Sequence, residues 1–285
     1  RGGFGEVFRA VHHAKERTEA LKVLSEESGV RVRYFQNEVH LVARLRHPNI
    51  ATLYEANLNN PPLYFTMEFV EGEQLGAYLK RQQLGLDQRL RLFRTIAEAV
   101  GHAHTQGVVH RDIKPQNVLI DATGQPRLVD FGIAKWLDAP TDGRGRAGPV
   151  EGAVGTYGYI APEQRSGGPV DTRADIYGLG ALLFHMVTGE PAQRAARTAR
   201  LGRLLHKWHV ARADDLAAII GRCLEPLPEQ RYTDCAALVR DLDNYLAGRP
   251  IEARGDATLA YRAARLAALV LRNSPLVVEL VVVLV

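Results

Sequence analysis

Apolar residues recur at helical spacing in three stretches of the chain. The first stretch predicts a helix from about Val30 to Leu45. The second predicts a helix that starts from an N-cap at Asp87 and runs to about Thr105, with His104 on its apolar face in a packing role. The third stretch is apolar almost all round, and it predicts a buried helix from Asp175 to about Val187.

Shorter apolar runs predict strands. Glu19–Val23 and Leu63–Val70 have the length and composition of buried strands. Two further runs, Val118–Ile120 and Leu128–Val129, are separated by the turn-forming residues Asp121–Gly124. This pattern predicts a hairpin, which would bring the residues just outside its open end close together.

Composition and charge exclude several classes of protein. The 285 residues are 46% hydrophobic and 24% charged, which is ordinary for a soluble globular chain that buries one large core or two smaller ones. A formal charge of +4 gives no support for a nucleic-acid partner. Cys223 and Cys235 fit neither a zinc pattern nor a disulfide framework, so a reducing cytosol is expected.

Chemically useful side chains gather around the predicted hairpin, in the sequences HRDIKPQN at 110–117 and DFG at 130–132. One aspartate in a polar loop is more often a turn former than a catalyst. Both motifs in this order, at the two ends of one hairpin, favour a catalytic interpretation. Here the chain resembles the protein kinase family, in which a catalytic loop HRD-x-x-x-x-N precedes a DFG motif.

The resemblance implies an α+β, two-lobed protein kinase fold, with a small β-rich N-lobe and a larger, mainly helical C-lobe. ATP and Mg²⁺, with Mn²⁺ as an alternative, would bind in the cleft between the lobes. Asp112 would be the catalytic base, and Lys114 would steady the γ-phosphate. Asn117 and Asp130 would be the metal ligands. Lys22, on the strand that resembles the family's V-A-I-K, would contact the α- and β-phosphates and pair with Glu38.

Other parts of the nucleotide site are implied in the same way. The first residues match the end of the family's glycine-rich loop, whose backbone approaches the phosphates. Met67 would be the gatekeeper before a hinge that binds adenine through its backbone. The full set of implied ATP-binding residues is Gly2, Gly5, Val7, Ala20, Lys22, Glu68, Val70 and Leu119.

The segment after the DFG motif corresponds to the activation segment and ends in APE at 161–163. Its sequence GTYGYIAPEQ most resembles the eukaryotic-like serine/threonine kinases of bacteria. Residues 142–155 contain no Ser, Thr or Tyr, so activation by phosphorylation of this loop stays open. The structural residues implied by the resemblance are His110, Arg111, Phe131, Gly132, Thr156, Glu163, Asp175 and Arg231.

The resemblance covers residues 1 to about 248: an N-lobe at 1–67, a hinge at 68–72 and a C-lobe at 73–248. Residues 249–274 are expected to form a basic, juxtamembrane-like tail. Residues 275–285 would then begin a transmembrane helix that anchors a cytoplasmic domain to the inner membrane, or else dock on the domain as an apolar helix or strand.

Proteins with Ser or Thr hydroxyls are the implied substrates, and the sequence predicts no nucleic-acid partner and no particular oligomer. A pseudokinase, which senses nucleotide or acts as a scaffold without turnover, is the alternative function. Such proteins commonly lack the counterparts of Lys22, Asp112 or Asp130, and all three are present here.

Overall fold

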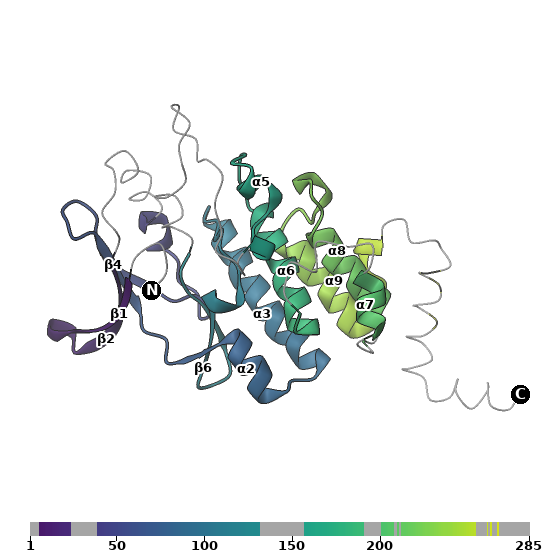
Figure 1. Cartoon of the computed structure of the whole chain (residues 1–285), viewed down its shortest axis with the longest axis horizontal. Helices are drawn as coiled ribbons and strands as arrows, with labels where there is room; N and C mark the ends of the chain where they lie inside the picture. The colour runs from purple at the N-terminus through teal and green to yellow at the C-terminus, as the bar shows by residue number, and fades with distance from the viewer. Residues whose placement is uncertain are drawn as a thin grey trace, which may run out of the picture.

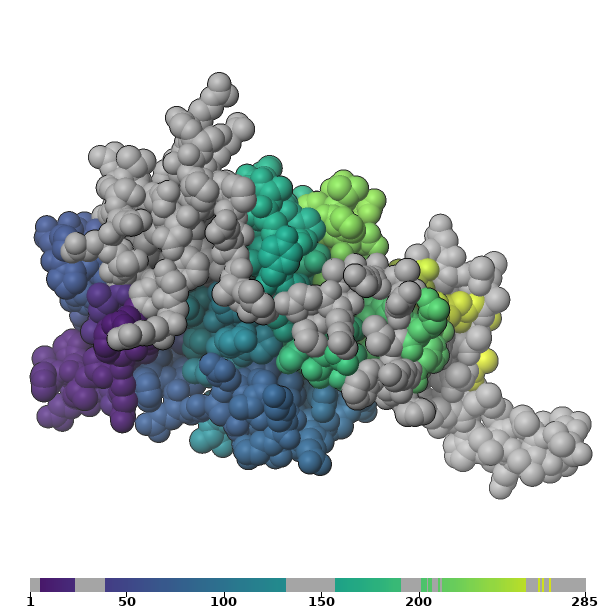
Figure 2. All heavy atoms as spheres, in the orientation of Figure 1, coloured from purple at the N-terminus to yellow at the C-terminus, as the bar shows by residue number. Residues whose placement is uncertain are grey.

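The computed structural model describes residues 6–23, 39–131, 157–190, 201–207, 210, 212–254, 261, 263 and 267. A small antiparallel sheet lies at one end of the molecule, and helices make up most of the remainder (Figure 1). The space-filling view shows the first two strands in purple at this end and the last helices in green towards the other (Figure 2). The molecule therefore has a two-lobed α+β arrangement.

The terminal sheet contains four strands in the order β1-β2-β4-β3. Their bounds are Glu6–His12, Arg17–Val23, Leu53–Asn57 and Tyr64–Glu68 for β1, β2, β3 and β4. Side chains two residues apart on a strand share a face. On β2, Ala20 and Lys22 are therefore on one face, and both are buried. The register places them opposite Met67 and Phe65 of β4, respectively.

A second sheet, β5-β6-β7, carries the hairpin that the sequence predicted. Its strands are Gly72–Gln74, Val118–Asp121 and Pro126–Leu128. Asp121 Oδ1 accepts hydrogen bonds from the backbone N–H groups of Thr123 (2.9 Å) and Gln125 (3.0 Å), which closes the turn. The hairpin is thus confirmed, although β7 begins two residues before the expected apolar run and ends one residue before its end.

The core of the helical lobe is α6, Arg173–Thr188, which is buried on nearly all sides and packs against α3, Leu86–Thr105, and α8, Ala213–Cys223. The buried helix predicted from Asp175 is therefore confirmed. Gly189 ends it with a left-handed backbone (φ 70°), which glycine adopts without steric cost. The other helices are α2 (Leu75–Gln82), α5 (Pro162–Arg165), α7 (Leu201–Lys207) and α9 (Cys235–Ala247).

The start of α3 differs from the sequence prediction. Asp87 is not the N-cap, because the helix begins at Leu86 and Gly85 precedes it in an extended conformation. The side-chain carbonyl of Gln88 accepts the Gly85 N–H (3.0 Å), so a residue in the first turn of the helix caps the N–H group that precedes it. Asp87 still lies in the first turn, where its charge suits the helix dipole. Of the helix predicted at 30–45, residues 39–45 are described; 39–42 are helical, and the chain turns at 43–44, so the helix ends before Leu45.

The chain remains packed on the helical lobe after α9. Ile251 is buried, and the buried carboxylate of Asp241 accepts the N–H groups of Glu252 (2.6 Å) and Ala253 (2.8 Å). The boundary predicted at 248 stays a prediction. Residues 275–285 lie outside the described residues, and no helix within the described ranges has the length and apolarity to span a membrane.

Candidate active site

Asp112 is the centre of a small hydrogen-bonded cluster. The side-chain amide of Asn117 donates to Asp112 Oδ2 and to its backbone carbonyl, both at 2.8 Å. Lys114 Nζ lies 2.8 Å from the same Oδ2. Asp112 is only 9% exposed. Two donors from its own loop therefore hold this carboxylate in one orientation, which is what a positioned proton acceptor requires.

The hairpin places Asp130 beside this cluster. Asn117 ends a short 3₁₀ helix directly before β6, and its carbonyl accepts the N–H of Val129 (3.0 Å). Asp130 is the next residue, and it has a left-handed backbone with φ 57°. Aspartate is among the few side-chain-bearing residues that tolerate this conformation. The backbone contact thus brings the two expected metal ligands to adjacent positions.

Lys22 connects the four-stranded sheet to this group of residues. Its ammonium donates to Asp130 Oδ1 in a close ion pair between residues 108 positions apart. The Lys22 side chain is almost completely buried, whereas that of Asp130 is one-third exposed. Glu38, the partner expected from the sequence, lies outside the described residues together with Gly2, Gly5, Gly132 and Thr156.

A buried carboxylate on α6 fixes the backbone of the catalytic loop. Asp175 accepts the N–H groups of His110 and Arg111, each at 2.7 Å, and His104 Nε2 lies 2.8 Å away. Burial alone would raise the pKa of Asp175, but the hydrogen bond and charge of His104 and the nearby His110 outweigh it, and the pKa lies below its ordinary value. His104 therefore has the packing role that the sequence predicted.

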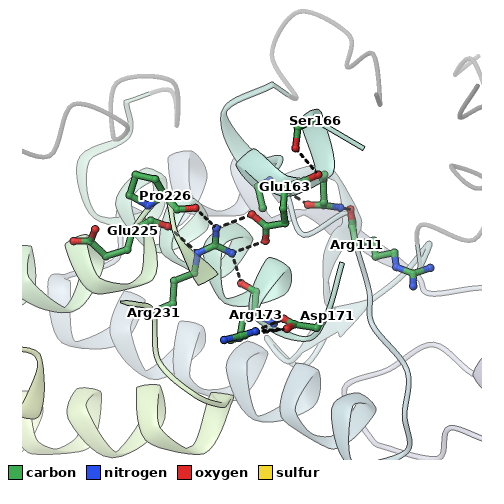
Figure 3. Close-up of polar contacts among 10 residues, drawn as sticks. Arg111, Glu163, Ser166, Asp171, Arg173, Glu225, Pro226 and Arg231 are labelled. Atoms are coloured by element: carbon green, nitrogen blue, oxygen red, sulfur yellow. Dashed lines mark hydrogen bonds and ion pairs between the residues drawn. The ribbon is translucent and has the colours of Figure 1, made fainter. Parts of the chain in front are cut away.

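Ring packing and a second ion pair complete the support of the loop. The His110 ring lies 4.4 Å from the Phe131 ring, centroid to centroid. The Arg231 guanidinium donates two hydrogen bonds to the Glu163 carboxylate, both at 2.7 Å (Figure 3). Arg231 also donates to the backbone carbonyls of Arg173, Glu225 and Pro226.

The remaining expected nucleotide residues that the structure describes lie on or next to strands of the two sheets. Ala20 is buried on β2, whereas Val7 on β1 is 57% exposed. Leu119 is half-buried on β6, and Val70 follows β4 in the segment predicted to be the hinge. The Glu68 side chain accepts the N–H of Thr52 (3.2 Å) and a close hydrogen bond from Arg127 of β7.

The donor set fits a hard divalent cation. Within the described ranges, no group of three or more His, Cys, Asp or Glu side chains is arranged to hold a metal ion. Asp130 nevertheless offers a carboxylate, and Asn117, whose NH₂ group is used by Asp112, has its amide oxygen left for a cation. Mg²⁺ prefers one or two such protein oxygens completed by phosphate and water.

The family model described as the protein kinase domain matches residues 1–242. The chain belongs to the protein kinase family. The sequence prediction of this family is thereby confirmed, and so is the α+β, two-lobed fold, because solved kinase domains superpose on it. The PknI kinase domain of Mycobacterium tuberculosis aligns with a TM-score of 0.65 and 26% identity, covering 86% of this chain and 91% of that one.

Two bacterial relatives of this kinase are named serine/threonine-protein kinases. Serine/threonine-protein kinase PknD of Protochlamydia amoebophila is 31% identical over 87% of this chain and 29% of its own length. Serine/threonine-protein kinase PknF of Mycobacterium tuberculosis is 33% identical over 87% of this chain and 55% of its own length. The chain thus spans about a third to a half of these relatives.

Sequence reasoning did not identify two residues that contact the kinase site. Arg127 donates to Glu68, an expected hinge residue, and the two are 59 positions apart, so no local pattern shows the contact. Gln164 donates to the carbonyl of Arg111 (3.1 Å). A weak signal existed for Gln164, because proline at the first position of a helix and glutamine at the third are typical of a helix start.

Proposed function

We propose that this kinase domain transfers the γ-phosphate of ATP to Ser and Thr hydroxyls of proteins. The observation that carries the proposal is that Lys22, from the four-stranded sheet, meets a group of polar side chains of the helical lobe. Asp112, Lys114 and Asn117 form one hydrogen-bonded cluster, and the Lys22–Asp130 pair lies beside it. The named relatives support serine and threonine as acceptors.

In the proposed reaction, Asp112 orients the acceptor hydroxyl and takes its proton. The hydroxyl oxygen forms a bond to the γ-phosphorus as the bond to the β,γ-bridging oxygen breaks, and ADP leaves. The clamp formed by Asn117 and Lys114 keeps one carboxylate orientation, so the proton acceptor does not have to reorganise during the reaction.

The charged side chains around Asp112 would act on the phosphates. Lys22 and Lys114 offset their negative charge, one from each lobe. Asn117 and Asp130 would hold Mg²⁺, which offsets charge on the transferred group when it is bound. The Asp130 side chain is one-third exposed to solvent, which supports this role, because a carboxylate that binds an ion from solution must be accessible to solvent.

Phosphate transfer from γ-labelled ATP to dephosphorylated casein by the 285-residue chain tests the proposal, with the phosphorylated residues identified in the product. We expect phosphoserine and phosphothreonine, and loss of transfer when EDTA removes divalent cations. Binding of ATP without any transfer would favour the pseudokinase alternative and would overturn the proposal. Labelling confined to tyrosine would overturn the acceptor class alone.

A further inference from the structure

The side chain of Gln164 links the helix α5 to the catalytic loop. Gln164 is 7% exposed. Its carbonyl oxygen accepts the N–H of Ala161 at the start of α5, and its NH₂ group donates to the backbone carbonyl of Arg111, each at 3.1 Å. Both ends of the amide are therefore engaged, one within α5 and one on the residue that precedes Asp112.

Arg111 has a backbone conformation that needs such support. Its φ is 64°, in the left-handed region that is costly for a residue with a side chain and persists only where neighbouring groups hold it. Asp175 holds the N–H of Arg111 (2.7 Å), and Gln164 holds its carbonyl. The peptide group between Arg111 and Asp112 is thus fixed through the Gln164 amide.

The helix α5 is itself fixed from its other side. Glu163, the residue before Gln164, receives two hydrogen bonds from the deeply buried Arg231 (Figure 3). Adjacent residues of one short helix therefore reach in two directions, towards the core of the helical lobe and towards the catalytic loop. An amide mounted on this anchored helix can hold its target in a fixed position.

We propose that Gln164 is a positioning residue for catalysis, which sets the orientation of Asp112 through the Arg111 carbonyl. This inference rests on the proposed kinase function. Gln164 lies outside the cluster of Asp112, Lys114 and Asn117, and its proposed role restricts which side chains could replace it. Only a side chain with an acceptor for Ala161 and a donor for Arg111 satisfies both partners.

Glutamate at this position separates the two contacts. In Gln164→Glu the side chain keeps its length and can still accept the Ala161 N–H, but it presents an oxygen in place of a donor to the Arg111 carbonyl. Gln88 offers a matched control, because its carbonyl accepts the Gly85 N–H at the start of α3 in the same way. Gln88→Glu is the same chemical change at a helix start that does not contact the catalytic loop.

The experiment measures kcat, the KM for ATP and the unfolding midpoint of the 285-residue chain, with casein as acceptor. We expect Gln164→Glu to lower kcat by about tenfold, because the loss of one hydrogen bond that orients Asp112 has an effect of about this size, and the KM for ATP should stay within about twofold of wild type. Gln88→Glu should leave kcat unchanged. Gln164→Met, which removes both polar groups without adding charge, should also lower kcat.

Each outcome decides a separate claim. A wild-type chain without phosphate transfer would overturn the proposed function. An active wild type with unchanged kcat in both Gln164 variants would overturn only the positioning role. Full activity in Gln164→Met beside a defect in Gln164→Glu would assign the defect to the added charge and would also overturn it. Should Gln164→Glu not fold, the kcat of Gln164→Met decides the question.

Discussion

Two buried carboxylates of this kinase, Asp112 and Asp175, differ in the groups that donate hydrogen bonds to them. Asp112, the proposed proton acceptor, accepts from two side chains, whereas Asp175 accepts from two backbone N–H groups and an imidazole and holds the loop. Charge on Asp175 is stabilised by these donors, and this makes its contribution to folding dependent on pH.

The pKa of Asp175 predicts how acid changes stability. The folded-state pKa is lowered below the ordinary 3.8, so the carboxylate stabilises the fold above that pH and the stabilisation disappears as pH falls through the folded value. Asp175→Asn should therefore be less stable than wild type at pH 7, and the gap should narrow below about pH 4. Urea unfolding of both proteins across this range measures it.

The exposed Asp87 of α3 supplies the control for this titration. Asp87→Asn also removes one charge, but it removes no buried contact, so its gap to wild type should be small at pH 7. A gap for Asp175→Asn that stayed constant or widened towards acid would contradict the proposed source of the stabilisation.

Among the secondary-structure elements, the short helix α5 depends most on one side chain of another element. Arg231 is fully buried and provides five hydrogen bonds, two of them to Glu163. Without this guanidinium, the Glu163 carboxylate and three backbone carbonyls each lose a hydrogen-bond donor. Breaking a buried pair from one side usually costs far more than the pair itself contributes.

We predict that Arg231→Met lowers the free energy of unfolding by about 3–5 kcal/mol. The control is Arg173→Met in the same region, because Arg173 pairs with the exposed Asp171 (2.6 Å) and should contribute less than about 1 kcal/mol. Urea denaturation of both variants makes the comparison. Equal losses would show that the burial of Arg231 has no special effect.

Comparison of sequence and structure shows which elements could be predicted. The hairpin and α6 could be predicted from the sequence, because apolar runs and turn residues are local signals. The start of α3 was not, because glycine and glutamine replaced the expected aspartate cap. The Lys22–Asp130 and Gln164–Arg111 contacts join residues 108 and 53 positions apart, and only the folded chain shows them.

Across the whole molecule, backbone contacts join the two lobes near the active site. Ala51 donates to the Leu128 carbonyl (2.9 Å), and Leu128 donates to the Asn49 carbonyl (2.8 Å), so the β6–β7 hairpin is attached to the segment that leads into the four-stranded sheet. At the far end of the helical lobe, buried Asp215 accepts from Arg254 (3.0 Å) and Tyr261 (3.2 Å) of the segment after α9.

These distal contacts predict that the stable domain extends past residue 248. A chain that ends at Gly248 loses the donors to Asp215 and Asp241 that come from Glu252, Ala253, Arg254 and Tyr261. We expect it to be less stable than a chain that ends at residue 267 by about 1–3 kcal/mol, the cost of buried acceptors that lose partners. Equal unfolding midpoints in urea would place the boundary at 248.

The central claim is that Asp112, held by Asn117 and Lys114, accepts the proton in phosphate transfer. The most direct test compares wild type with Asp112→Asn, a substitution of the same size, in kcat at saturating ATP and in the affinity for ATP. We predict that kcat falls at least about 100-fold while ATP affinity changes little. Equal phosphate transfer by the two proteins would contradict the claim.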